Sequence, residues 1–197
     1  MCNAEQDWLE KARNGDEDSF TRLVETYQTP VYNLCYRMLG EGTAAEDAAQ
    51  ETFWRAYQNL KRYDPSRPFI TWLLSIAAHH CIDQQRKHRL PTFELDEFPE
   101  MDIVDSSIPN PEKEMNHYQE NDALHQLINQ LNPQDRATVI LKYWYDCSEE
   151  EISQMLSLTV SAVKSRLHRS RRQLAEMVST NPMLVVNERR THESPAL

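Results

Sequence analysis

The sequence predicts an all-α protein made of two small helical domains joined by an acidic flexible linker, the C-terminal domain being a helix-turn-helix. The chain has only 3 Gly but 10 Pro, and it lacks a run of alternating β-branched residues. Such a composition favours helices separated by Pro-marked loops. Apolar residues keep helical spacing up to about residue 90 and again from residue 124, but not between. With 197 residues and 40% apolar content, the chain has enough material for two small cores.

Helices are expected over most of the first 60 residues. Helical spacing runs through residues 20–27 and, after Pro30, through residues 31–38, and Gly40 marks a turn. In the next helix, over residues 43–60, Thr43 and Glu46 have the spacing of a capping box. An apolar stripe faces the core, and polar residues lie away from it. That polar face, which contains Asp47, Gln50 and Glu51, is either a solvated surface or a docking surface.

Two prolines, Pro65 and Pro68, bound a short loop over residues 61–68. A strongly apolar helix follows over residues 69–89 and ends in Arg86-Lys87-His88-Arg89. These basic side chains either stabilise the helix C-terminus or contact phosphates.

The acidic charge of the chain is concentrated in its middle. Between Glu94 and Asp122 there are ten acidic residues and one Lys, and three prolines interrupt the same stretch. The formal net charge of −10 therefore does not argue against nucleic-acid binding elsewhere in the chain. The composition of this segment predicts a linker and a domain boundary.

The C-terminal part has the pattern of a helix-turn-helix. Helical spacing covers residues 124–131 and 133–144, and Ser148 with Glu151 forms a capping box. Ser157-Leu158-Thr159 is the expected turn, with Thr159 as the N-cap of the last helix. One face of residues 160–174 is apolar, and the other carries short polar and basic side chains. This division suits a helix in the major groove of DNA.

Cysteine usage and the absence of long apolar runs indicate a cytoplasmic protein. The four cysteines are scattered, without a Cys-x-x-Cys pair, and are expected to be free thiols in a reducing compartment. The acidic N-terminus does not resemble a signal peptide, and apolar runs stay short of the roughly 20 residues that span a bilayer. We therefore expect a cytoplasmic location and no membrane insertion.

Taken together, these motifs resemble the bacterial RNA polymerase sigma factors of the extracytoplasmic-function type, in the sigma-70 family. The resemblance rests on Ala-Glu-Asp-Ala-Ala-Gln-Glu-Thr-Phe from residue 45, Phe-Ile-Thr-Trp-Leu-Leu-Ser-Ile-Ala from residue 69 and Val-Lys-Ser-Arg-Leu-His-Arg-Ser-Arg-Arg from residue 163. It covers about residues 5–178. It implies a sigma2-like domain at 1–90, an acidic linker at 91–114, a sigma4-like domain at 115–178 and a disordered tail at 179–197. In the family such a linker threads through the polymerase, where an acidic segment can mimic nucleic acid in a basic channel; a merely solvating linker is the alternative.

The resemblance implies an initiation factor that is not an enzyme and needs no cofactor or metal. Its partners are core RNA polymerase, through the β′ clamp helices and the β flap, promoter DNA and an anti-sigma factor in a stress or envelope response. It assigns polymerase binding to one set of residues: Asp47, Gln50, Glu51, Phe53 and Trp54. It assigns recognition and melting of the minus-ten element to a second: Tyr63, Ser66, Arg67, His79, Arg86, Lys87 and Arg89. It assigns the minus-thirty-five element to a third: Ser161, Lys164, Ser165, Arg166 and Arg169.

The chain departs from the family pattern at four places. Ala78-His79 stands where members often have Arg-Asn, and Ser161-Ala162 stands where they have Gly-Thr. Asp146 and Ser157 occupy positions that are often Gly, before the capping box and at the turn.

Two other readings of the sequence stay open. A helix-turn-helix regulator with an N-terminal sensor domain has a similar C-terminal half. A metal-dependent enzyme would use His79, His80, Cys81 and Asp83, but adjacent helical residues point about 100° apart and only His79 and Asp83 have ligand spacing.

Overall fold

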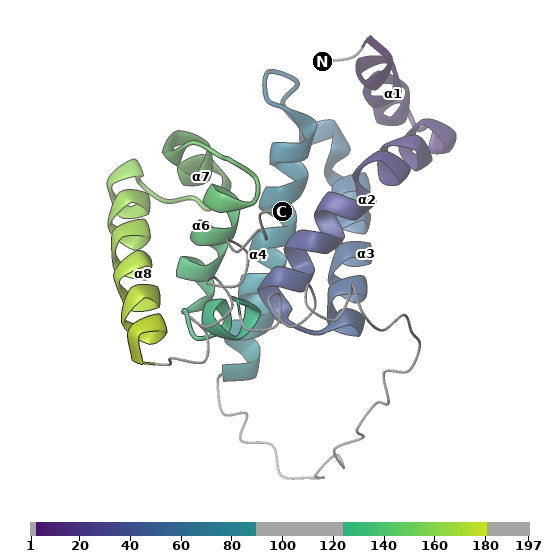
Figure 1. Cartoon of the computed structure of the whole chain (residues 1–197). Helices are drawn as coiled ribbons and strands as arrows, with labels where there is room; N and C mark the ends of the chain where they lie inside the picture. The colour runs from purple at the N-terminus through teal and green to yellow at the C-terminus, as the bar shows by residue number, and fades with distance from the viewer. Residues whose placement is uncertain (1–2, 90–123, 181–197) are drawn as a thin grey trace, which may run out of the picture.

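The computed structural model describes residues 3–89 and 124–180, and the regular elements in these residues are all helical (Figure 1). The N-terminal half contains α1 (Asn3–Arg13), α2 (Glu17–Leu39), α3 (Gly42–Asn59), the 3-10 turn η1 (Leu60–Arg62) and α4 (Phe69–Arg89). The C-terminal half contains a helical segment at 124–129, then α6 (Pro133–Tyr143), α7 (Glu149–Met155) and α8 (Val160–Thr180). The all-α prediction is confirmed.

The predicted linker at 91–114 lies outside the described residues, as does the tail beyond residue 180. Helix α8 includes residues 179 and 180, so it extends two residues into the predicted tail. No helix in the described parts of the chain is both long and apolar enough to cross a membrane.

Three helices build the core of the N-terminal half. Helices α2, α3 and α4 pack against one another, and α1 lies on α2. The buried face of α3 is rich in alanine, which lets neighbouring helices approach closely because it adds little side-chain bulk. Asp16 caps the start of α2 by accepting from the Ser19 N–H at 2.9 Å, and Gly40 ends it at φ 80°, where glycine is unstrained.

The capping box expected at Thr43 is wrong. Helix α3 begins at Gly42, and its N-cap is Glu41, whose carboxylate accepts from the N–H groups of Thr43 at 3.2 Å and Ala44 at 3.1 Å. A carboxylate with two oxygens satisfies two free N–H groups together, and its charge is favourable at the positive end of the helix. Glu41 therefore starts the helix earlier than a Thr43 cap would.

The buried side chains of the C-terminal half belong to one hydrophobic core with those of the N-terminal half. The fully buried ones include Leu131, Ile140, Leu141, Ile152 and Val163. Helix α6 contacts α8 and α7 and also contacts α4 and α2 of the N-terminal half. In Figure 1 it accordingly lies between α8 and α4. Helix α6 thus packs against helices of both halves.

Polar contacts join the two halves across a large separation in sequence. The buried Arg136 of α6 donates from Nη1 to the Met38 carbonyl at 2.5 Å, at the end of α2, and Gln85 of α4 donates to the same carbonyl. The Tyr145 hydroxyl donates to the Pro30 carbonyl at 2.6 Å. The sequence predicted two helical domains, but it did not predict that they pack against each other.

Candidate nucleic-acid and protein interfaces

The helix-turn-helix is built from α7, a short turn and α8. Ser148 Oγ accepts from the Glu151 N–H at 3.1 Å, and the Glu151 carboxylate accepts from the Ser148 N–H at 2.8 Å, so the capping-box prediction is confirmed. These hydrogen bonds from Ser148 lower the pKa of Glu151 below its usual value. Thr159 Oγ1 accepts from the Ala162 N–H at 3.2 Å, which confirms Thr159 as the cap of α8.

Two residues of this motif have left-handed backbone conformations. Asp146 has φ 49° and Ser157 has φ 54°, and they are the only non-glycine residues with positive φ in the described chain. They are the two positions at which glycine was expected from the family pattern. The turn geometry is therefore formed without glycine, and each side chain carries the steric strain that glycine lacks.

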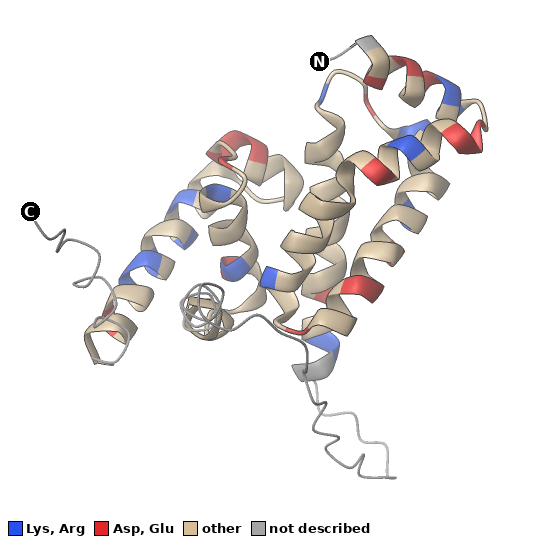
Figure 2. Ribbon diagram, turned by 45° about the vertical axis from the view of Figure 1, so that its right-hand side comes forward, with Lys and Arg blue, Asp and Glu red and all other residues tan. Residues whose placement is uncertain are grey.

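Helix α8 has an apolar face and a basic face. Val163 and Leu167 are buried against α6 and α7. The opposite face is exposed, and Figure 2 shows Lys and Arg positions, in blue, spaced along the ribbon of α8. It includes four of the five residues assigned to the minus-thirty-five element: Ser161, Lys164, Ser165 and Arg169.

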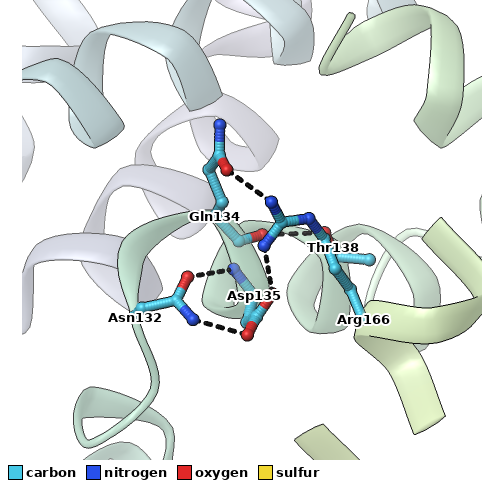
Figure 3. Close-up of polar contacts among 5 residues, drawn as sticks. All are labelled: Asn132, Gln134, Asp135, Thr138 and Arg166. Atoms are coloured by element: carbon cyan, nitrogen blue, oxygen red, sulfur yellow. Dashed lines mark hydrogen bonds and ion pairs between the residues drawn. The ribbon is translucent and has the colours of Figure 1, made fainter. Parts of the chain in front are cut away.

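Arg166, the fifth residue assigned to the minus-thirty-five element, is placed differently. Its guanidinium donates to Asp135 Oδ1 at 2.6 Å and to Gln134 Oε1 at 2.7 Å, both on α6 (Figure 3). The Arg166 side chain is 20% exposed and that of Asp135 is 8% exposed. Sequence spacing put Arg166 on a flank of the basic face, but it could not show that a carboxylate lies beside it.

The polar face of α3 is exposed, as its pattern indicated. Asp47 and Gln50 are exposed, and the half-exposed Glu51 accepts a hydrogen bond from Arg55 at 2.6 Å, which lowers the pKa of Glu51. Trp54 is 57% exposed. Phe53, by contrast, is buried in the core and supports this face from below.

A groove of about 380 Å³ runs beside this face, and α2 forms its second wall. From α2 it is lined by Gln28, Thr29 and Tyr32, and from α3 by Gln50 and Phe53 among others. The sequence-based assignment missed the α2 wall. The only sequence feature that could have indicated this wall was the i, i+4 spacing of Gln28 and Tyr32, which puts a polar and an aromatic residue on one face of α2.

The loop between η1 and α4 is held by Tyr63. This residue is 4% exposed, its hydroxyl donates to the Arg67 carbonyl at 2.5 Å, and its ring contacts Phe69 and Trp72. Ser66 and Arg67 are exposed. The buried ring of Tyr63 offers no free face for stacking, so it anchors the loop that presents Ser66 and Arg67.

The residues of α4 divide in the same way. His79 is exposed, with Nδ1 2.8 Å from the Ser75 carbonyl oxygen, while Ala78 is fully buried. Arg86 and Lys87 are exposed near the C-terminal end of α4, and the side chain of Arg89 lies outside the described part. Of the Ala78-His79 pair, only His79 is available to a ligand on the surface.

The residues of the metal-enzyme alternative do not converge. Cys81 is fully buried beside Cys35, and the hydrogen bond between the two thiols, together with burial, raises the pKa of the Cys81 thiol. His79, by contrast, is exposed. Within residues 3–89 and 124–180, no group of three or more His, Cys, Asp or Glu side chains is arranged to hold a metal ion.

Comparisons with known proteins agree on one family. Residues 23–90 match the family described as Sigma-70 region 2, and residues 121–174 match Sigma-70, region 4. The ECF RNA polymerase sigma factor SigW of Bacillus subtilis is 35% identical over 179 residues, covering 86% of this chain and 94% of that protein. The RNA polymerase sigma-H factor of Pseudomonas aeruginosa is 32% identical, covering 87% and 93%. The solved structure of CnrH in complex with the cytosolic domain of CnrY superposes with a TM-score of 0.67 at 22% identity, covering 91% of this chain and 99% of CnrH.

Proposed function

The chain belongs to the sigma-70 family, as a transcription initiation factor of the ECF type and not an enzyme, and we propose that it directs core RNA polymerase to a two-element promoter through three separate surfaces. The observation that carries the proposal is that an exposed acidic helix and an exposed basic helix lie on different halves of one chain. The acidic helix α3 suits a protein partner, and the basic face of α8 suits DNA.

The first surface, on α3, binds core polymerase. Asp47, Gln50 and Trp54 are exposed there and free to contact the β′ clamp helices, with Glu51 at the edge. Trp54 supplies the large aromatic contact that protein interfaces favour. Phe53 contributes through packing and through the groove wall that it forms with α2.

The second surface binds and melts the minus-ten element. Ser66 and Arg67 on the loop reach for an extracted base, while Tyr63 holds the loop in shape. Extracting a base costs a few kcal/mol, and a loop that is already ordered avoids a further entropic cost. His79, Arg86 and Lys87 extend this surface along α4, and we assign Arg89, whose side chain lies outside the described part, to the same element.

The third surface reads the minus-thirty-five element. Ser161 and Ser165 offer hydroxyl groups to base edges, and Lys164 and Arg169 offer cations to phosphates or guanine. These residues lie on the first half of α8, the part of a recognition helix that enters the major groove.

Binding both elements together requires the two halves to separate. The nominal positions of the minus-ten and minus-thirty-five elements differ by about 25 base pairs, or about 85 Å at 3.4 Å per pair. The halves contact each other here through Arg136 and Met38. The 34 residues from 90 to 123 can reach about 110 Å at about 3.3 Å each, enough to connect the two sites.

The family also supports regulation by an anti-sigma factor and a cytoplasmic location. The location follows because a sigma factor must reach core polymerase. The regulation follows because it should do so only when it is required. The genes transcribed with this factor would then belong to a stress or envelope response.

Run-off transcription with core polymerase on a genomic library tests the function. We expect transcripts whose start sites share two upstream elements. Lys164→Ala and Arg169→Ala should weaken promoter binding and spare core binding, whereas Asp47→Ala and Gln50→Ala should do the reverse. Specific binding of a palindromic duplex without polymerase, and no transcripts with it, would support the sensor-regulator alternative instead.

A further inference from the structure

Arg166 is the one basic residue among the five assigned to the minus-thirty-five element that forms an ion pair within the protein. It lies on α8, between the exposed Lys164 and Arg169, but its guanidinium points to the start of α6 (Figure 3). Nη1 donates to Asp135 Oδ1 at 2.6 Å, and Nη2 donates to Gln134 Oε1 at 2.7 Å. The planar fork of the guanidinium therefore holds two acceptors on neighbouring residues of α6.

Asp135 is itself fixed from the other side. Its N–H donates to Asn132 Oδ1 at 3.0 Å, and its Oδ2 accepts from Asn132 Nδ2 at 2.5 Å. Asn132 is the N-cap of α6, so Asp135 lies in the first turn, where a negative charge is favourable. The Asp135 carboxylate that accepts from Arg166 is thus held in place by hydrogen bonds at the start of α6, independently of α8.

This contact adds direction to an interface that also contains buried apolar side chains. The buried Val163 and Leu167 hold α8 by hydrophobic contact, which is strong but non-directional. The paired hydrogen bonds of Arg166 restrict both sliding and rotation of α8 on α6, because the angles and distances of both bonds must be kept.

We propose that Arg166 is a positioning residue that sets the orientation of the recognition helix, and that it does not itself contact the minus-thirty-five element. Base contacts in the major groove need side chains placed to within about 0.5 Å. By tying the middle of α8 to the N-terminus of α6, Arg166 and Asp135 fix the position from which Ser161, Lys164, Ser165 and Arg169 reach the DNA. This inference rests on the proposed function of α8 as the minus-thirty-five reader.

The alternative, in which Arg166 contacts DNA directly, predicts the opposite sign for one variant. If Arg166 bound phosphate, Asp135→Asn would remove a competing carboxylate and a negative charge, and DNA affinity would rise. If Arg166 positions α8, Asp135→Asn removes the buried carboxylate that holds it, so the affinity for the intact element falls toward that for the scrambled element.

The experiment uses full-length protein with core polymerase and a promoter duplex obtained from the run-off mapping. Affinity is measured for this duplex and for the same duplex with a scrambled minus-thirty-five element, over a range of salt concentrations. The variants are Asp135→Asn, Arg166→Met and the milder Gln134→Leu, which removes only the second acceptor. Arg169→Met is the matched control, because Arg169 is exposed on the same helix.

We expect Asp135→Asn and Arg166→Met each to lower the ratio of the two affinities by about tenfold, the scale of one lost base contact. Their double variant should be no worse than either alone, because both remove one interaction. Gln134→Leu should lower the ratio less. Arg166→Met should leave the salt slope unchanged, whereas Arg169→Met should reduce it by about 0.9.

Thermal unfolding of each variant separates positioning from simple loss of stability. A smaller folded fraction scales both affinities equally and leaves their ratio unchanged, so an altered ratio reports on the orientation of α8. An unchanged ratio in Asp135→Asn, or a salt slope reduced in Arg166→Met as much as in Arg169→Met, would overturn the inference. If the parent protein does not distinguish the two duplexes, the proposed function of α8 fails instead.

Discussion

Ser157, the left-handed residue in the turn between α7 and α8, provides a direct test of how this turn is stabilised. Ser157 has φ 54°, and its side chain is exposed. A non-glycine residue in this conformation costs about 1–2 kcal/mol through contact between Cβ and the following carbonyl. Replacement by glycine removes this cost, but it adds about 0.5–1 kcal/mol of backbone entropy lost on folding. We therefore expect Ser157→Gly to raise the free energy of unfolding by about 0.5–1 kcal/mol.

Asp146→Gly should act in the same direction with a smaller gain, because aspartate adopts φ 49° more readily than serine does. The two sites are separate turns, so their effects should add. Urea unfolding followed by circular dichroism measures all three proteins, and the double variant enlarges the signal.

Gln173→Gly is the control for a general effect of glycine. Gln173 is exposed in the interior of α8, where glycine should cost about 0.7–1 kcal/mol. A Ser157→Gly variant no more stable than the parent would refute the strain argument, because the gain depends only on the left-handed conformation.

Three further predictions concern the caps and the contact between the two halves. Arg136→Met should lower the free energy of unfolding by about 3–5 kcal/mol, because buried carbonyls at Ile128, Met38 and Asn129 lose a charged donor. Urea unfolding measures this change, and a loss below about 1 kcal/mol would contradict the prediction. Tyr145→Phe should cost about 1 kcal/mol through the lost bond to Pro30, with the exposed Tyr143→Phe as a neutral control in the same assay. Because its folded-state pKa is lowered from 4.5, Glu151 stabilises the protein above that pH and loses this contribution as the pH falls below it. Glu151→Gln should therefore flatten the stability profile as the pH falls through 4.5 and below, and an unchanged profile would count against the capping box.

Local patterns were sufficient to predict the helices and much of their exposed surface. Helical periodicity separated Val163 and Leu167 from Lys164 and Arg169, because residues three or four apart share a face whatever the rest of the chain does. The cap at Ser148 was also predictable, since its partner is three residues away. The Thr43 cap failed because an adjacent carboxylate, Glu41, was a better local acceptor.

Contacts between distant parts of the chain were decided only by the tertiary structure. By itself, the sequence determined the all-α class, the helix-turn-helix and the basic face of α8, because these depend on neighbours within a few residues. It could not show that Tyr63 is buried, that Arg136 reaches Met38 or that Arg166 faces Asp135, 31 residues away. An arginine has the same spacing on its helix whether it faces a phosphate or a carboxylate. Only the packing of α8 on α6, which brings the buried Asp135 within 2.6 Å, decides which anion it holds.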